Sequence, residues 1–496
     1  MTEGGLLPAA LLGPLSEACA RGYTIVVADP FFAEALKAEM GYAQVQDLFS
    51  WASATLGVSK PDPVDLLLAC REALTVIQSY KGDSLAGEWE LAQRLGRDWQ
   101  EVLLHTPSLR EASAYWDELA SHRQIQGLFS LYQDASLDWL GVLPLPQRKS
   151  DAMRVFWSCL REFLDAYQRA LREKRKVLFS EEAIHRLLEN PNWDRVLFLH
   201  LYSPYPLINK LLSIAYEKGV EIWGWDVKTL REHLPEVWDP LPPLTGAASW
   251  PDRVRPVSIS ELPSLVEVVE AAAQAVASYV RAQPTARVAV WCEEEIAFLF
   301  RHLFEREGMG AFLSPSVLPL WAGTQVGKVL AEHMGSGLRG ELSAWPSVEC
   351  ADSPQEKWVQ RVYEWVCEKA HPGEPASWQF LLAFLQTHTP ILSPFSPDTR
   401  VYVGRLTQLA GGAYDAVFII QPSEEPLGRW SRPSFWLFSL RNRFFPRERH
   451  HQLSWRLQSL LLWGSREVHI WRQAGEEFRS PLEDFLRHTK LFELDR

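Results

Sequence analysis

The chain has 496 residues, of which 47% are hydrophobic and 23% charged, and its net charge is −12. This composition is typical of a folded globular protein of about two to four folding units, and it argues against a protein that coats nucleic acid over its whole surface. No apolar run reaches the roughly 18 residues that span a bilayer, and the N-terminus lacks a positively charged export signal. We therefore expect a cytoplasmic protein without membrane contact.

The six cysteines are far apart in the sequence and form no CxxC pair. Zinc ribbons and iron–sulfur clusters need closely spaced thiolates, so the sequence predicts neither. Reduced cytosolic thiols are the simplest interpretation. We expect no metal and no cofactor.

The first half of the chain alternates strands and helices. The apolar run over 22–28 predicts a buried strand, and Asp29-Pro30 is a typical helix start. Residues from about 62 to 190 carry apolar positions at helical spacing and predict a helical insertion. Further strands are predicted over 195–200 and 220–225, with a helix over 205–218 between them.

The second half repeats this pattern after a Pro-rich, irregular stretch over 237–256, which predicts a boundary. Residues 320–392 are again helical and predict a second insertion. The other predicted elements are strands over 256–260, 287–292, 417–420 and 467–472 and helices over 261–282, 293–307 and 450–463.

The predicted fold class is α/β, with two parallel-sheet cores, each interrupted by a helical insertion. The first core covers 1–60 and returns over 191–236, and the second covers 257–319 and returns over 396–496. The helical insertions cover 61–190 and 320–395, and the linker covers 237–256.

Four segments in this order resemble the AddB-type subunits of AddAB helicase–nucleases, which are related to RecB, RecC and the superfamily 1 helicases. They are 24–37, 195–225, 258–290 and 401–472. The most informative is the strand over 417–420 with its Pro-rich acidic loop. The resemblance implies two RecA-like cores in the layout of a superfamily 1 helicase.

An active motor of that family needs a GxxxxGK[ST] loop that cradles phosphates. Gly323–Lys328 is one residue short and is followed by Val329, and Gly82–Gly87 is followed by Glu88. Ordinary helix or loop is the simpler interpretation of both segments.

Two further motor features are missing. The loop over 200–206 contains no carboxylate where the family places an Asp-Glu pair that binds Mg²⁺. Trp463 stands near the position of the arginine that contacts the γ-phosphate, with Arg466 as an alternative three residues later. The resemblance therefore implies an inactivated motor and no enzyme activity.

The nuclease domain that such subunits often carry would begin about where this sequence ends. Asp226-Val-Lys228 with Asp194 is the closest match to a nuclease metal site, and exposed strand-end residues are the simpler interpretation.

An Arg-rich, aromatic segment follows the 417–420 strand. Seven arginines lie between positions 429 and 456 against a single acid, Glu448, and aromatic residues are interleaved with them. Arginine forks bind phosphates and aromatic rings stack on unpaired bases. The candidate nucleic-acid contacts are Arg429, Arg432, Trp436, Arg441, Arg443, Arg447, Arg449 and Arg456. The alternatives are arginines paired with acids of a neighbouring domain or subunit, or contacts with RNA or another anion.

The leading hypothesis is a non-catalytic, helicase-like subunit in a DNA repair, recombination or defence complex. It would act as a scaffold and guide single-stranded DNA for a partner that carries ATPase and nuclease activity. The alternatives are a divergent nuclease or ATPase completed in trans by a partner, and a purely structural interaction protein without a nucleic-acid role.

Overall fold

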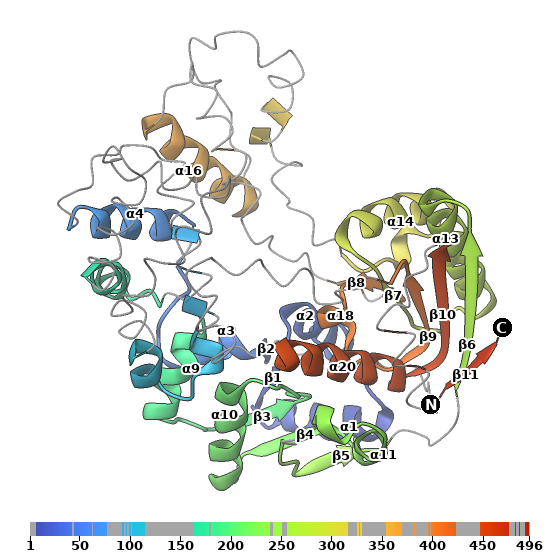
Figure 1. Cartoon of the computed structure of the whole chain (residues 1–496), viewed down its shortest axis with the longest axis horizontal. Helices are drawn as coiled ribbons and strands as arrows, with labels where there is room; N and C mark the ends of the chain where they lie inside the picture. Colours follow the sequence, from blue (N-terminus) through green and yellow to red (C-terminus); the bar gives the residue numbers. More distant parts are fainter. Residues whose placement is uncertain are drawn as a thin grey trace, which may run out of the picture.

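The chain folds into two α/β units, each built on a sheet of parallel strands (Figure 1). Within the part of the chain that the structure describes, no helix is both long and apolar enough to cross a bilayer. The computed structural model describes residues 6–41, 44–61, 63–76, 102–114, 162–177, 180–238, 242–249, 255–315, 354–369, 398–422, 447–475 and 492–495, and a few isolated positions between them.

The first sheet has five strands in the order β2-β1-β3-β4-β5, and every neighbouring pair is parallel. This is the flavodoxin-like order of doubly wound α/β folds. The strands are β1 (Thr24–Val27), β2 (Val45–Asp47), β3 (Val196–Leu199), β4 (Glu221–Trp225) and β5 (Gly246–Ala248).

Alternate residues of these strands enter two cores. Ile25 and Val27 join the core that contains α1, α2, α11 and α12, whereas Val26 joins the core of α3, α9 and α10. Helices therefore cover both faces of the sheet, as the period-2 pattern of a buried strand requires. The helices are α1 (Ala9–Ala20), α2 (Pro30–Met40), α3 (Leu48–Thr55), α9 (Ser180–Glu189), α10 (Pro206–Glu217), α11 (Lys228–His233) and α12 (Pro235–Trp238).

The second sheet has six parallel strands in the order β11-β6-β10-β9-β7-β8. Helices α13 and α14 pack on one face, and α18 and α20 contribute to the core on the other. The elements are β6 (Arg255–Leu262), α13 (Leu265–Ala282), β7 (Val288–Trp291), α14 (Glu294–Arg306), β8 (Val401–Gly404), α18 (Leu406–Leu409), β9 (Tyr414–Ile420), α20 (Arg447–Trp463), β10 (Ser465–Gln473) and β11 (Phe492–Asp495).

One hydrophobic core joins the two units. It combines Phe31 of α2 and Trp225 of β4 with Val417 of β9 and Leu461 of α20, all of them buried. An ion pair between Arg287 and Glu39, 3.0 Å apart, also crosses from the second unit to the first. Because the core is continuous across the junction, the two sheets form one packed body.

The parallel sheets confirm the predicted α/β class. Each predicted strand is present, within a few residues at its ends. The linker predicted as irregular over 237–256 is wrong in part, because β5 lies inside it and extends the first sheet. The two predicted insertions lie largely outside the described residues; within them, α4 (Pro63–Leu74), α9 and α16 (Pro354–Lys369) are helical. The predicted end of the first insertion at 190 is too late, because α9 packs in the core of the first sheet.

Candidate functional site at the carboxyl edges of the sheets

Parallel sheets bind ligands outside the carboxyl ends of their strands, at the point where the strand order reverses. In the first sheet that point lies between β1 and β3. The residues that follow these strands are Asp29 after β1 and His200 after β3. This edge of the first sheet is therefore the first candidate for a ligand site.

Asp29 is used to start a helix. Its Oδ1 accepts a hydrogen bond from the backbone N–H of Phe31 at 2.8 Å, which caps the N-terminus of α2. Burial raises the pKa of the Asp29 carboxyl to about 6, although hydrogen bonds from the Phe31 and Phe32 backbone lower it. The capping role accounts for the presence of an acid here.

His200 fills the crevice itself. Its ring is 7% exposed and stacks on Trp225, with ring centroids 5.6 Å apart, and Tyr202 and Phe32 lie next to it. Neither ring nitrogen has a hydrogen-bond partner among the described residues, and burial lowers the pKa of His200 to about 3. An aromatic stack thus occupies the place where a fold of this kind would hold a ligand.

The second unit closes this stack from the other side. Trp225 Nε1 donates a hydrogen bond to the carbonyl of Gly411 at 3.0 Å, across 186 positions of sequence. Gly411 adopts φ +94°, and a side chain there would contact the His200 ring. Because Gly411 precedes β9, the carboxyl edge of the first sheet packs against the amino edge of the second.

The two candidates for a phosphate-contacting arginine lie in other contacts. Trp463 is buried, and the guanidinium of Arg255 lies 4.1 Å from its ring centroid. Arg466 is half-exposed at the start of β10 and pairs with Asp415 at 3.4 Å. The phosphate-loop candidate at 82–87 lies outside the described residues, as do three of the six residues of the other at 323–328.

Arg456 must be removed from the predicted nucleic-acid contacts. Its side chain is fully buried at the junction of the units, where it donates hydrogen bonds to the carbonyls of Val237 and of Ser203, the latter at 2.9 Å. The guanidinium also lies over the Trp238 ring at 5.6 Å. Arg456 therefore joins α20 to the first unit and presents no charge at the surface.

The other predicted contacts follow β9 in the sequence. In that sheet the strand order reverses between β7 and β9, and β9 ends at Ile420. Gln421 adopts φ +48°, and its Oε1 accepts a hydrogen bond from the Gln473 backbone at 2.9 Å. The segment 423–446 begins two residues later, so it starts at the edge where α/β sheets bind ligands. Arg429, Arg432, Trp436, Arg441 and Arg443 lie outside the described residues, and Arg447 and Arg449 belong to the first turn of α20.

Acidic residues stand at the same edge. Glu293, Glu294 and Glu295 follow β7 at the start of α14, and Glu294 pairs with Arg405 after β8. Burial raises the pKa of Glu293. Carboxylates are the partners that the alternative of arginines paired within the protein requires.

The proposed nuclease pair is not brought together. β3 and β4 are parallel, and Asp194 precedes β3 whereas Asp226 follows β4, so the two acids lie at opposite edges of the sheet. Asp226 instead accepts a hydrogen bond from the Lys228 backbone at 3.0 Å. Among the described residues, no group of three or more His, Cys, Asp or Glu side chains is placed to hold a metal ion.

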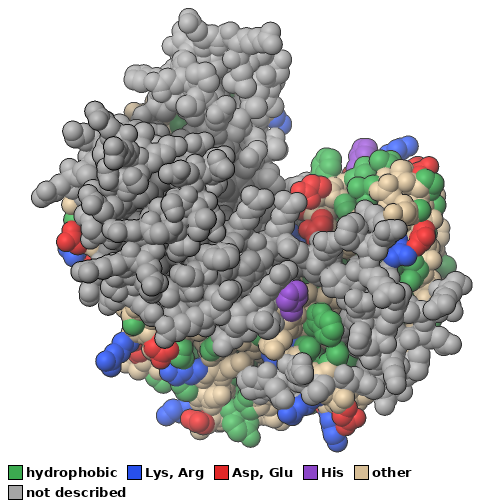
Figure 2. All heavy atoms as spheres, in the orientation of Figure 1, with side chains coloured by type: hydrophobic (Ala, Val, Ile, Leu, Met, Phe, Trp, Pro, Cys, Tyr) green, Lys and Arg blue, Asp and Glu red, His purple; other side chains and the backbone are tan. Residues whose placement is uncertain are grey.

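The visible charges are mixed. On the face shown in Figure 2, described Lys/Arg and Asp/Glu side chains alternate along the lower margin. The described residues on this face therefore form no patch of one charge. No protein-family model matches the chain, and no curated protein matches its sequence.

Proposed function

We propose that this protein is a non-catalytic, helicase-like subunit that supports and guides single-stranded DNA for a cytoplasmic partner carrying ATPase and nuclease activity. The observation that carries the proposal is the filled crevice between the two sheets. His200, Trp225 and Gly411 occupy the place where a two-core motor would need an open nucleotide site.

The shared core supports the same proposal. A motor with two cores works by opening and closing the cleft between them. Here the cleft residues belong to one hydrophobic core, reinforced by Arg456 with its two backbone carbonyl partners. A junction of this kind favours a rigid scaffold over a motor whose two cores move relative to one another.

The DNA role is supported by the position of the Arg-rich segment. Five of the predicted contacts are in a segment that begins at the ligand-binding edge of the second sheet. Guanidinium groups and aromatic rings together suit the backbone and bases of an unpaired strand.

The test is the binding of a labelled single-stranded oligonucleotide, measured by fluorescence anisotropy over a series of salt concentrations. Charge reversal at Arg441 and Arg443 should weaken binding at low salt at least tenfold. The double change should also flatten the plot of log K against log salt by about 1.4, because each lost phosphate contact removes about 0.7.

The matched control reverses Arg306 and Arg361, which are exposed on α14 and α16 and give the same change in net charge. We expect the control to bind within about twofold of the unchanged chain. No binding at low salt would overturn the DNA role and favour a structural interaction protein. Metal-dependent cleavage lost in Asp226→Ala would favour the nuclease completed in trans.

A further inference from the structure

A second cationic cluster lies on the first unit, far in sequence from the Arg-rich segment. The helix over 162–173 ends in a run with five basic residues among eight positions, and Glu173 is the one acid among them. The five are Arg169, Arg172, Lys174, Arg175 and Lys176. The chain as a whole has a net charge of −12, so the positive charge of this run contrasts with the rest of the sequence.

The structure holds this run against two other segments. Ser59 forms a parallel bridge with Lys176, and its backbone N–H donates to the Arg175 carbonyl at 3.2 Å. Lys176 pairs with Asp65 of α4 at 3.2 Å. Arg169, Lys174 and Arg175 remain exposed. With Arg172, the cluster is therefore a surface with four exposed cations.

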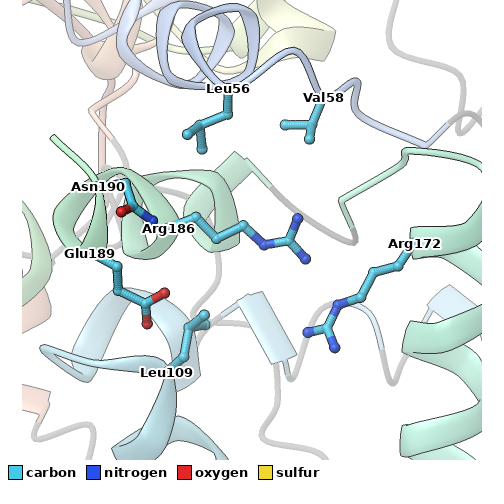
Figure 3. Close-up of a pocket in the computed structure, with 7 residues that line it drawn as sticks. All are labelled: Leu56, Val58, Leu109, Arg172, Arg186, Glu189 and Asn190. Carbon is cyan, nitrogen blue, oxygen red and sulfur yellow. The ribbon is translucent and has the colours of Figure 1, made fainter. Parts of the chain in front are cut away.

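A pocket of about 490 Å³ opens beside this surface (Figure 3). Leu56 and Val58 line one side of it and Leu109 the opposite side, while the side chains of Arg172 and Arg186 extend between them. Glu189 and Asn190 complete the lining. Arg172 also lines an adjoining hollow with Asp165, Arg169 and Glu173.

The two pocket arginines are held in place by one buried acid. Arg172 and Arg186 each donate a hydrogen bond to Oε1 of Glu182 at 2.8 Å, and Glu182 is 1% exposed. Glu182 and the pocket-lining Glu189 together balance the two guanidinium charges. Each guanidinium has five N–H donors, and the contacts with Glu182 and, for Arg172, with Gln168 use only part of them. The pair is therefore preorganised and keeps donors for an anion in the pocket.

We infer that this pocket and the adjoining cationic surface bind one stretch of single-stranded DNA. The aliphatic walls accept a base, Arg172 and Arg186 bind its phosphate, and Arg169, Lys174 and Arg175 contact the neighbouring phosphates. The volume falls in the range of small-ligand sites, roughly 300–1,000 Å³. A row of exposed cations beside the pocket favours a polyanion over a small free ligand.

This inference rests on the proposed DNA-guiding function and gives it a second contact point. The first experiment reverses Arg169 and Lys174, both exposed, so that the Arg172–Glu182–Arg186 contact stays intact. We expect about tenfold weaker binding of the single-stranded oligonucleotide and a salt plot flatter by about 1.4. The Arg306 and Arg361 double reversal is again the control of equal charge.

The second experiment tests the pocket itself. Arg172→Lys keeps the positive charge beside Glu182 but loses the planar fork. We expect binding three- to tenfold weaker with an unchanged melting temperature. Arg281→Lys is the matched control, because Arg281 is exposed to a similar extent, at 50% against 47% for Arg172, and also pairs with a glutamate, Glu307.

Photocrosslinking with an iododeoxyuridine oligonucleotide gives a direct readout, and adducts should map to peptides within 162–190. The inference is overturned, with the proposed function intact, if only reversal of Arg441 and Arg443 weakens binding and adducts map elsewhere. Both are overturned if the chain binds no oligonucleotide at low salt. Equal competition by polyglutamate would overturn the assignment to nucleic acid.

Discussion

The side chain of His200 fills the crevice between the two sheets. This residue follows a buried strand, adopts φ +56° and stacks on Trp225 without a hydrogen-bond partner for either nitrogen among the described residues. Sequence alone showed that the loop lacked carboxylates. It could not show that the histidine turns inward, because that depends on Gly411, more than two hundred positions later.

Burial of His200 makes a prediction about pH. An unfolded histidine titrates near pH ~6.5, and burial lowers the pKa of His200 to about 3 in the folded chain. The unfolded state therefore binds the proton first as the pH falls. Protonation of His200 therefore does not change the free energy of unfolding above about pH 6.5. Below that pH it lowers the free energy of unfolding by up to about 1.4 kcal/mol per pH unit.

A phenylalanine at position 200 cannot take up a proton. It also removes the two ring nitrogens, which have no hydrogen-bond partner among the described residues. We expect His200→Phe to raise the free energy of unfolding at pH 7.5 by about 1 kcal/mol, with a larger gain at pH ~5.5. Urea denaturation at the two pH values measures both. His302→Phe, on an exposed position of α14, should show neither effect. A gain independent of pH would contradict the buried, neutral state of His200.

Among the elements, α20 shows best why part of the site could not be predicted. Its arginines looked like one basic group in the sequence. In the structure the helix lies between the two units, and Arg456 points into the interior toward Val237 and Ser203. A count of charges along a helix does not distinguish an exposed face from a face buried by a second unit.

The strands show the same limit. Four of the seven predicted strands contain a run of four or more apolar residues, the other three have polar residues between the apolar ones, and all seven are present. The four strands that were not predicted, β2, β5, β8 and β11, have three or four residues each and lie at the edges of the two sheets. They form by backbone hydrogen bonding to the outermost strand of an existing sheet. The local sequence pattern does not show that such a strand is available. The cationic run 169–176 was not predicted as a site, because the apolar spacing of its segment indicates only a helix.

The turn from α20 into β10 makes a prediction at this scale. A Cβ on Gly464 would lie 2.4 Å from the Gly412 carbonyl oxygen, and the Gly464 carbonyl accepts a hydrogen bond from the Tyr414 backbone at 2.9 Å. Both partners are backbone, so neither can move aside. We expect Gly464→Ala to cost about 3 kcal/mol, in the upper range of overpacking.

The control for Gly464→Ala is Gly41→Ala. Gly41 ends α2 at φ +70° with open space around its Cβ position. Only the left-handed backbone penalty applies there, about 1 kcal/mol. Thermal or urea unfolding compares the two. Equal losses would show that the α20 turn is not tightly packed against the loop before β9.

At the scale of the whole molecule, two parallel sheets with helices on both faces could be predicted from the sequence. Their shared core could not, because Phe31, Trp225 and Val417 come from three distant segments. In the proposed function, this shared core favours a rigid scaffold over a motor. Among the described residues, His200 and Trp225 fill the crevice between the sheets.

We propose that this two-core fold does not hydrolyse ATP. Measuring ATP hydrolysis by the purified chain tests this proposal most directly. The rate would be measured with and without single-stranded DNA, for the unchanged chain and for Lys328→Ala in the nearest phosphate-loop candidate. We predict a rate equal to the background in all four cases. Hydrolysis that DNA stimulates and that Lys328→Ala abolishes would contradict the account.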